Sequence, residues 1–321
     1  MTTNNIFQKD FYLADGGLET TLIYHQGLKL NHFAAFELLT HEQGKEEMAK
    51  YYVPYLDLAE KKGLNFILET PTWRANPDWA YKLGYSNDEL NAINRNAVTF
   101  LRSLLASHTI DSSKVVLSGC VGPRGDGYIA GDCMTPAEAK AYHFEQIQAF
   151  ALADADITSA ITMTYSDEAL GIALAARELH IPAVISFTVE TDGRLPNGET
   201  LKSAIEKVDA ELDGYPEHYM INCAHPEHFI HVLEEKGNWK SRIRGVRANA
   251  STKSHAELDA SDTLDTGDKS RLTEGYRKLS TLLPNLIVLG GCCGTDHTHL
   301  QVICEATVSG QDKTQKVEAS K

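Results

Sequence analysis

The strongest constraint on the fold of this chain is a repeated alternation between short apolar runs and segments of helical character. Eight runs of apolar or β-branched residues occur along the 321 residues: Tyr12–Ala14, Leu64–Leu68, Val115–Cys120, Asp156–Thr162, Ala183–Thr188, Tyr219–Cys223, Ile243–Ala248 and Leu286–Leu289. Strands that alternate with helices pair in parallel, because each helix must cross back over the sheet. Eight such units favour closure into a (β/α)8 TIM barrel over the alternative, an open doubly wound sheet.

Two of the intervening helices are marked by their first residues. Ser86 stands three residues before Glu89, and Thr135 stands three residues before Glu138, with Pro136 at the first helical position. Both pairs have the spacing of a capping box, in which the two residues satisfy each other's free backbone N–H groups. The helix predictions therefore do not depend on apolar periodicity alone.

One barrel accounts for most of the chain. Barrels of this kind run to several hundred residues as one domain, and a composition with 42% apolar residues can bury a large core. We predict a single domain over residues 1–308 and a polar tail over residues 309–321, which lack periodicity. The segment Asn249–Asp268 is rich in Ser, Thr, Asp and Gly, and it is predicted to be a long loop on the active-site face.

Charge and composition limit the partners and the location. The formal net charge of −14, without a stripe of Lys and Arg, argues against nucleic acid. The start, Met1–Lys9, is polar and lacks the apolar run of a secretory signal, and no segment approaches the length of a membrane span. We expect a cytoplasmic protein that acts on small molecules. The sequence does not indicate an oligomeric state.

Three of the six cysteines stand where strands six and eight are predicted to end. Cys292 and Cys293 lie within Gly290–Thr295, and Cys223 follows Asn222. Three thiolates suit Zn²⁺, and a fourth position left open for substrate is typical of a catalytic zinc site. In the alternative, these cysteines are small buried apolar residues. One of four nearby histidines could also replace a sulfur: His225, His228, His297 and His299.

Three motifs resemble the zinc-dependent homocysteine S-methyltransferase family: Gly290–Thr295, Asn222–Cys223 and Asp15–Thr20. The resemblance extends over nearly the whole chain, and it implies that the three cysteines bind zinc. A thiol bound to a metal is deprotonated and remains nucleophilic. The resemblance thus implies methyl transfer to a small thiol, with homocysteine giving methionine as the expected reaction. The donor is expected to be of the S-methylmethionine, S-adenosylmethionine or betaine type, and the residues do not decide among these.

The resemblance also suggests roles for residues at other strand ends. Asp15 and the backbone beside it are expected to hold the amino-acid substrate, whereas Glu69 is an addition to the family pattern. We predict that Asp15 and Glu69 are catalytic. The predicted substrate-binding residues are Gly16, Gly17, Thr70, Thr72, Trp73, Asn222 and Asn249.

One departure from the family pattern concerns the acceptor. The family usually carries a Glu-Thr pair after the fourth strand to hold the substrate amino group, whereas Ala160–Thr164 contains no carboxylate. Either Glu69 supplies this charge, or the acceptor is a different small thiol that lacks the ammonium group, because a charge in a desolvated pocket needs a partner.

Two further alternatives lie outside methyl transfer. A zinc hydrolase or lyase on the same barrel is disfavoured, because such sites usually have His and carboxylate ligands. The other alternative is a non-enzymatic protein that senses zinc or thiols.

Overall fold

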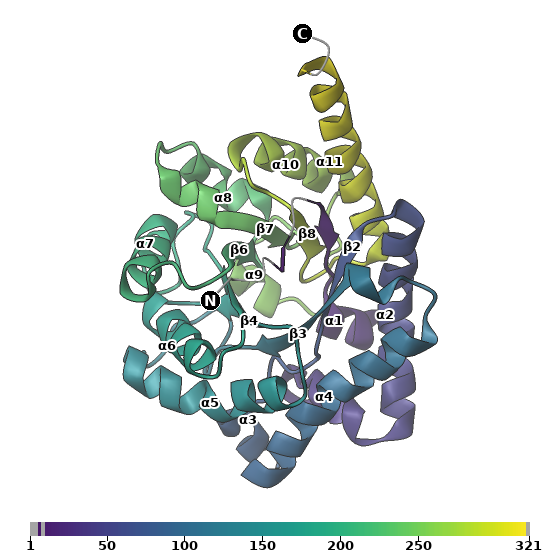
Figure 1. Cartoon of the computed structure of the whole chain (residues 1–321), viewed down its shortest axis with the longest axis vertical. Coiled ribbons are helices and arrows are strands. Elements are labelled where there is room, and N and C mark those ends of the chain that lie inside the picture. The colour runs from purple at the N-terminus through teal and green to yellow at the C-terminus, as the bar shows by residue number, and fades with distance from the viewer. Residues whose placement is uncertain (1–5, 8–9, 319–321) are drawn as a thin grey trace.

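The chain forms one closed barrel of eight parallel strands, which follow one another around the barrel in the order of the sequence (Figure 1). The structure, a computed structural model, describes residues 6–7 and 10–318. The strands are β1 (Tyr12–Leu13), β2 (Asn65–Glu69), β3 (Val115–Val121), β4 (Ile157–Met163), β5 (Ala183–Phe187), β6 (His218–Asn222), β7 (Ile243–Ala248) and β8 (Val288–Gly291). Each strand overlaps one of the eight apolar runs, so the predicted (β/α)8 barrel is confirmed.

Helices surround the barrel and connect its strands (Figure 1). The α-helices are α1 (Leu18–Thr20), α2 (Glu42–Lys62), α3 (Pro77–Lys82), α4 (Asn87–Ser107), α5 (Pro136–Leu152), α6 (Ser166–Glu178), α7 (Leu201–Leu212), α8 (Pro226–Leu233), α9 (His255–Asp259), α10 (Lys269–Leu282) and α11 (His297–Glu318). Shorter helical turns are η1 (Thr21–His25), η2 (Asn31–Phe33), η3 (Ala35–Thr40), η4 (Ser112–Lys114) and η5 (Asn238–Arg242). Both predicted capping boxes are present, at the starts of α4 and α5.

The barrel interior is packed at the amino ends of the strands. Residues from several strands form one apolar cluster there, and Phe7 packs into this cluster. The ring of Phe7 packs edge-on against His218, with 4.6 Å between the ring centroids. A second, larger cluster fills the space between the strands and the surrounding helices.

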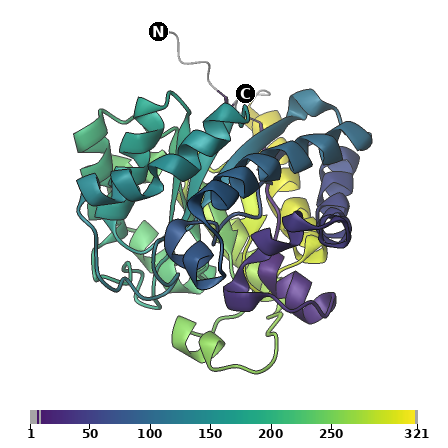
Figure 2. The ribbon, with the colours of Figure 1, turned by 90° about the horizontal axis from the view of Figure 1, so that it is seen from below.

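Two segments differ from the sequence prediction. The predicted loop Asn249–Asp268 contains the short helix α9, which starts with a capping box between Ser254 and Glu257. In Figure 2 this segment, in light green, projects from the same face of the barrel as α1, in purple. The predicted tail from residue 309 continues α11 as far as Glu318, and residues 319–321 lie outside the described residues. The division of the chain at residue 308 remains a prediction.

No helix in the described part of the chain has the length and apolar character required to cross a membrane.

Candidate active site

A cavity of about 240 Å³ opens at the carboxyl ends of the strands. It brings together ten of the twelve residues that the sequence predicted for the site: Asp15, Gly16, Gly17, Glu69, Thr70, Trp73, Asn222, Cys223, Cys292 and Cys293. Thr72 and Asn249 are buried behind this lining rather than in it. The position of the cavity is the one expected for a barrel enzyme.

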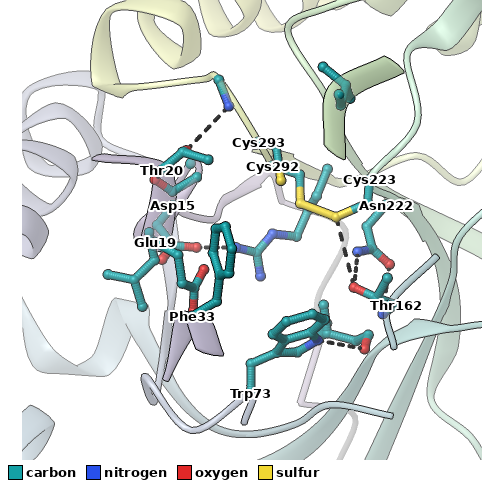
Figure 3. A pocket seen from close by; sticks show the side chains of 18 of the residues that line it. Asp15, Glu19, Thr20, Phe33, Trp73, Thr162, Asn222, Cys223, Cys292 and Cys293 are labelled. Carbon is teal, nitrogen blue, oxygen red and sulfur yellow. Dashed lines mark hydrogen bonds and ion pairs between the residues drawn. A yellow bond between two sulfur atoms is a disulfide. The ribbon is translucent and has the colours of Figure 1, made fainter. Parts of the chain in front are cut away.

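The three predicted cysteines meet at one point of this cavity. The Sγ atoms of Cys223, Cys292 and Cys293 all lie within 4.8 Å of one another. Ligand sulfurs around a tetrahedral zinc ion, each about 2.3 Å from the metal, are separated by roughly 3.8 Å, so the three cysteines lie close enough to hold one ion when all are reduced. Cys223 and Cys292 are joined as a disulfide in the structure, while Cys293 is free (Figure 3). A metal therefore requires the reduced pair, because thiolates are the ligands.

Unusual backbone angles turn two side chains toward this cluster. Cys223 and Thr162 both have positive φ angles, 54° and 67°. This conformation is costly for any residue with a Cβ and especially for a β-branched one, and it persists where the surrounding structure enforces it. Thr162 Oγ1 lies 3.8 Å from Cys223 Sγ, to which it donates a hydrogen bond.

Asn222 links β6 to β4 and β5 beside the cluster. Its Oδ1 accepts hydrogen bonds from the Thr162 backbone N–H at 3.0 Å and from Ser186 Oγ at 2.6 Å. Its Nδ2 donates to Thr162 Oγ1 at 2.8 Å. Asn222 lines the cavity, and these three bonds fix the strand end that carries Cys223.

A second layer of residues holds the carbonyl of Cys223. Asn249 Nδ2 donates to this oxygen at 2.9 Å, and His255 Nε2 lies 2.7 Å from it. Tyr128 stacks on His255 with 3.9 Å between ring centroids, and its hydroxyl lies 3.5 Å from Cys293 Sγ. The sequence did not indicate Tyr128, which lies in a loop, or His255, which begins the short helix α9, because the positions of both depend on the folded barrel.

The thiol of Cys293 has a raised pKa. Burial raises its pKa to about 11, against a weaker opposing effect of the hydrogen bond with Tyr128. Without a bound cation this group therefore stays protonated near neutral pH. The four candidate histidines are not part of the cysteine group or of the cavity lining.

Two glycines allow the chain to pass close to the cysteines. A Cβ on Gly17 would lie 2.7 Å from the carbonyl oxygen of Cys292. Gly294 has a φ of +79°, in the left-handed region that favours glycine. The Gly294 N–H donates to Thr20 Oγ1 at 3.3 Å, so the turn that follows β1 packs directly on the turn that carries the cysteines.

The opposite side of the cavity holds a buried ionic network. The guanidinium of Arg247 donates to Asp15 and to Glu69, and all three side chains are buried. Tyr51 donates to Asp15 at 3.0 Å, and Ser118 donates to Glu69 at 3.1 Å. Both predicted catalytic carboxylates are thus already partnered. Arg247 stands at the end of the seventh apolar run, but no motif identified it as a site residue.

Burial and neighbouring charges shift the pKa values of this network in opposite directions. Burial raises the pKa of Asp15 to about 6, although the positive charge of Arg247 opposes the shift. Burial also disfavours the charged form of Arg247, but the two carboxylates outweigh this effect and raise its pKa above the usual value. Arg247 therefore remains a cation.

Glu19 is a third carboxylate on this wall that the sequence analysis did not select. It lies on α1, within the motif that begins at Asp15, and it lines the cavity. Burial raises its pKa to about 7, with a further contribution from the negative charge of Asp15.

Aromatic and hydroxyl side chains complete the cavity. Trp73 donates from Nε1 to the carbonyl of Ile161 at 3.2 Å, and the guanidinium of Arg74 lies 4.1 Å from its ring centre. Thr70 Oγ1 accepts the backbone N–H of Cys120 at 2.8 Å and lies 2.7 Å from Thr72 Oγ1. The two threonines thus connect β2 to β3, which explains why Thr72 is buried outside the lining.

Solved structures with the same fold include a methyltransferase in three states. The homocysteine methyltransferase MmuM from Escherichia coli in its metallated form matches with a TM-score of 0.71 and 17% identity over 92% of this chain and 96% of that one. Its oxidized form matches with a TM-score of 0.70 and 20% identity over 93% and 96%. Its apo form matches with a TM-score of 0.62 and 18% identity over 93% of this chain and 96% of that one. No curated protein matches the chain significantly in sequence.

The closed barrel and the cluster of three thiols at its carboxyl end define a barrel protein with a thiolate site suited to a metal. The sequence profile of the family described as homocysteine S-methyltransferase matches residues 12–307. The chain belongs to this family and is a methyltransferase.

Proposed function

We propose that this protein is a zinc-dependent S-methyltransferase that methylates homocysteine to methionine. The observation that supports this most strongly is the convergence of three cysteine sulfurs at a cavity in a chain of the homocysteine S-methyltransferase family. Cys223, Cys292 and Cys293 would hold the ion, and the cavity leaves room for a substrate thiol beside them. Zn²⁺ at this site supplies a positive charge that lowers the pKa of the substrate thiol into the neutral range.

The chemistry requires a nucleophilic sulfur and a cationic methyl donor. The S–CH₃ bond forms on the homocysteine sulfur while the bond between the methyl carbon and the donor sulfur or nitrogen breaks. The electron pair of that bond stays on the donor heteroatom, which becomes neutral, and the thiol proton leaves to solvent. No protein side chain has to act as a base in the transfer itself.

Side chains around the three cysteines fix the positions of their sulfurs. Asn222 and Thr162 fix the strand end that carries Cys223, and Tyr128 contacts Cys293, so the three sulfurs keep one arrangement. Second-layer contacts of this kind set the geometry of ligand sites.

The donor side of the cavity is aromatic. Tyr24 and Phe33 line the cavity and are 44% and 48% exposed, and Phe33 has a positive φ of 58°. Aromatic faces attract sulfonium and quaternary ammonium groups. The donor's onium group would therefore meet these rings at the mouth of the cavity. Two other aromatic residues of the chain, Trp79 and Tyr165, do not belong to the lining.

The test is methionine formation by the reduced, zinc-loaded protein. Homocysteine is supplied with S-methylmethionine, S-adenosylmethionine or betaine, and methionine is measured by mass spectrometry. We expect methionine with at least one donor, and loss of activity after a chelator removes zinc. Equal activity with and without zinc would contradict the proposed metal dependence, and no methionine with any donor would contradict the proposed acceptor or donor class.

A further inference from the structure

The wall formed by the ends of β1 and β2 and by α1 has more negative than positive charge. Asp15, Glu19 and Glu69 all line the cavity on this wall, whereas the guanidinium of Arg247 is shared between Asp15 and Glu69. Three ionised carboxylates and the guanidinium of Arg247 leave two negative charges in excess, and the other cation of the lining, Arg74, lies 3.9 Å from the carboxylate of Asp126. A cluster of buried charges of this kind is costly unless a cation pairs with it.

Glu19 is the carboxylate of this wall without a cationic partner. Among the described residues, no Lys, Arg or His forms an ion pair with it. The nearby Arg74 lies between the rings of Trp73 and Trp79, 4.1 and 4.0 Å from their centres, and donates to the carbonyl of Gly125 at 2.7 Å. Burial, with a smaller contribution from Asp15, raises the pKa of Glu19 to about 7, and the more distant charges of Arg74 and Arg247 oppose this shift only in part.

The position of Glu19 relates it to the sulfur cluster. Figure 3 shows Glu19 beside Asp15, across the cavity from Cys223. The first turn of α1 packs on the cysteine turn through the contact between Thr20 and Gly294. A short molecule whose thiol lies at the sulfurs can therefore extend along this wall toward Glu19.

We infer that Glu19 is a specificity-determining residue that accepts the α-ammonium group of the acceptor thiol, next to the Asp15–Arg247–Glu69 network. This inference rests on the proposed function, in which the acceptor is an amino acid. A primary ammonium has three N–H donors and needs acceptor oxygens, and bonds from an ammonium to a carboxylate are among the stronger hydrogen bonds. A donor's onium centre has only alkyl groups and fits the aromatic mouth instead.

The experiment compares two acceptors that differ in one group. Binding of homocysteine and of 4-sulfanylbutanoate, which keeps the thiol and the carboxylate but lacks the ammonium group, is measured by calorimetry on the reduced, zinc-loaded full chain. The variant Glu19→Gln keeps the size of the side chain and removes its charge. We expect the Kd of homocysteine to rise about tenfold in Glu19→Gln and the Kd of 4-sulfanylbutanoate to stay within about twofold. Glu42→Gln, an exposed carboxylate at the start of α2, is the matched control and should change neither value.

Two further measurements separate the possible failures. Glu19→Asp keeps the charge on a shorter side chain, so we expect its Kd for homocysteine to lie between those of the wild type and Glu19→Gln. This variant also tests the inference if Glu19→Gln does not fold. S-methylmethionine, which carries its own ammonium group, is titrated alone. An unchanged Kd for homocysteine in both variants, or weaker binding of S-methylmethionine only, would overturn the inference. If the wild type makes methionine while both variants bind homocysteine normally, the proposed function stands without this role for Glu19; if the wild type does not bind homocysteine, both fail.

Discussion

The two walls of the cavity differ in the charge state of their side chains. The wall formed by the ends of β6 and β8 presents three cysteines, of which the free Cys293 has a pKa raised to about 11 by burial. The wall formed by β1, β2 and β7 presents charges that are already ionised, and Arg247 pairs with Asp15 and Glu69. The free thiol of the sulfur wall needs a cation before it can lose its proton near neutral pH. On the charged wall, Asp15 and Glu69 already have a cationic partner without a ligand, and Glu19, among the described residues, does not.

This difference indicates how the two walls respond to change. A residue of the sulfur wall can be replaced with little effect on folding, because a neutral thiol resembles a small apolar side chain. Its loss should instead remove metal binding. A residue of the charged wall is part of the folded structure, because removal of one partner leaves a buried charge unpaired.

The largest effect is expected for Cys292→Ala. The variant removes one of three ligands, so zinc content should fall from about one ion per chain to near zero, and methylation should fall at least about a thousandfold. Metal content is measured by elemental analysis and activity by methionine formation. The matched control is Cys133→Ala, an exposed free cysteine outside the cluster, which should keep both. If Cys292→Ala retains zinc and activity, the sulfur wall is not the metal site.

The next effect is expected for Arg247→Met, and it concerns stability. The variant leaves Asp15 and Glu69 buried without their cation, so the free energy of unfolding in urea should fall by about 3–5 kcal/mol. Arg277→Met, which breaks an exposed pair with Glu274, should change it by less than about 1 kcal/mol.

A double variant sharpens this result. Adding Glu69→Gln to Arg247→Met removes one of the two unpaired charges, and part of the lost stability should return. If Arg247→Met unfolds at the same urea concentration as the wild type, the network is not structural, and the contrast between the walls fails.

A smaller effect is expected in the pH dependence of acceptor binding. The titratable and charged groups that line the cavity are Asp15, Glu19, Tyr24, Tyr52, Glu69, Arg74, Cys120, Asp126, Tyr128, Cys223, Arg247, Asp259, Asp265, Cys292 and Cys293. Burial raises the pKa of Asp15 to about 6 and that of Glu19 to about 7, and the protonated forms cannot pair with an ammonium group. The affinity for homocysteine relative to 4-sulfanylbutanoate should therefore fall about tenfold or more between pH 8 and pH 5. In Glu19→Gln the step near pH 7 should be missing; if it persists, another group causes it.

The raised pKa values of Asp15 and Glu19 have the opposite effect on the stability of the ligand-free protein, which falls as the pH rises. Its folded state holds the protons of Asp15 and Glu19 more tightly than the unfolded state does. Their contribution to stability is full below the ordinary carboxyl pKa values of 3.8 and 4.5, and it is lost as the pH rises through about 6 to 7.

The smallest effect is expected for Tyr128→Phe. This change removes the hydroxyl 3.5 Å from Cys293 Sγ but keeps the ring that stacks on His255. A single neutral hydrogen bond contributes about 0.5–1.5 kcal/mol, so zinc affinity, measured by competition with a chromogenic chelator, should fall severalfold. Tyr81→Phe, at an 84% exposed position, is the control and should leave it unchanged. A loss as large as that of Cys292→Ala would mean that Tyr128 is a ligand rather than a positioning residue.

Local sequence patterns predicted the fold and one wall of the site. The strands follow from apolar runs, and the helix starts at Ser86 and Thr135 follow from capping boxes, because both depend on neighbours in the chain. The cysteines could be grouped because parallel strands end on one face of a barrel. Helix α9 was missed although Ser254 and Glu257 have the capping-box spacing, because the polar composition around them is typical of a loop.

The charged wall could not be predicted in the same way. Arg247 contacts Asp15 and Glu69 across 232 and 178 residues of sequence, and nothing in its own neighbourhood indicates these partners. The positive φ angles of Thr162 and Cys223 are equally hidden, since neither residue is a glycine. Contacts that depend on closure of the barrel become visible only in the folded chain.

The central claim is that three cysteines hold zinc and leave one position open for the acceptor thiol, and X-ray absorption at the zinc edge tests it most directly. The reduced, zinc-loaded protein should show three sulfur ligands at about 2.3 Å and one oxygen or nitrogen ligand, and addition of homocysteine should raise the sulfur count to four. A site with four sulfurs before homocysteine is added, or a ligand set that homocysteine does not change, would contradict the account.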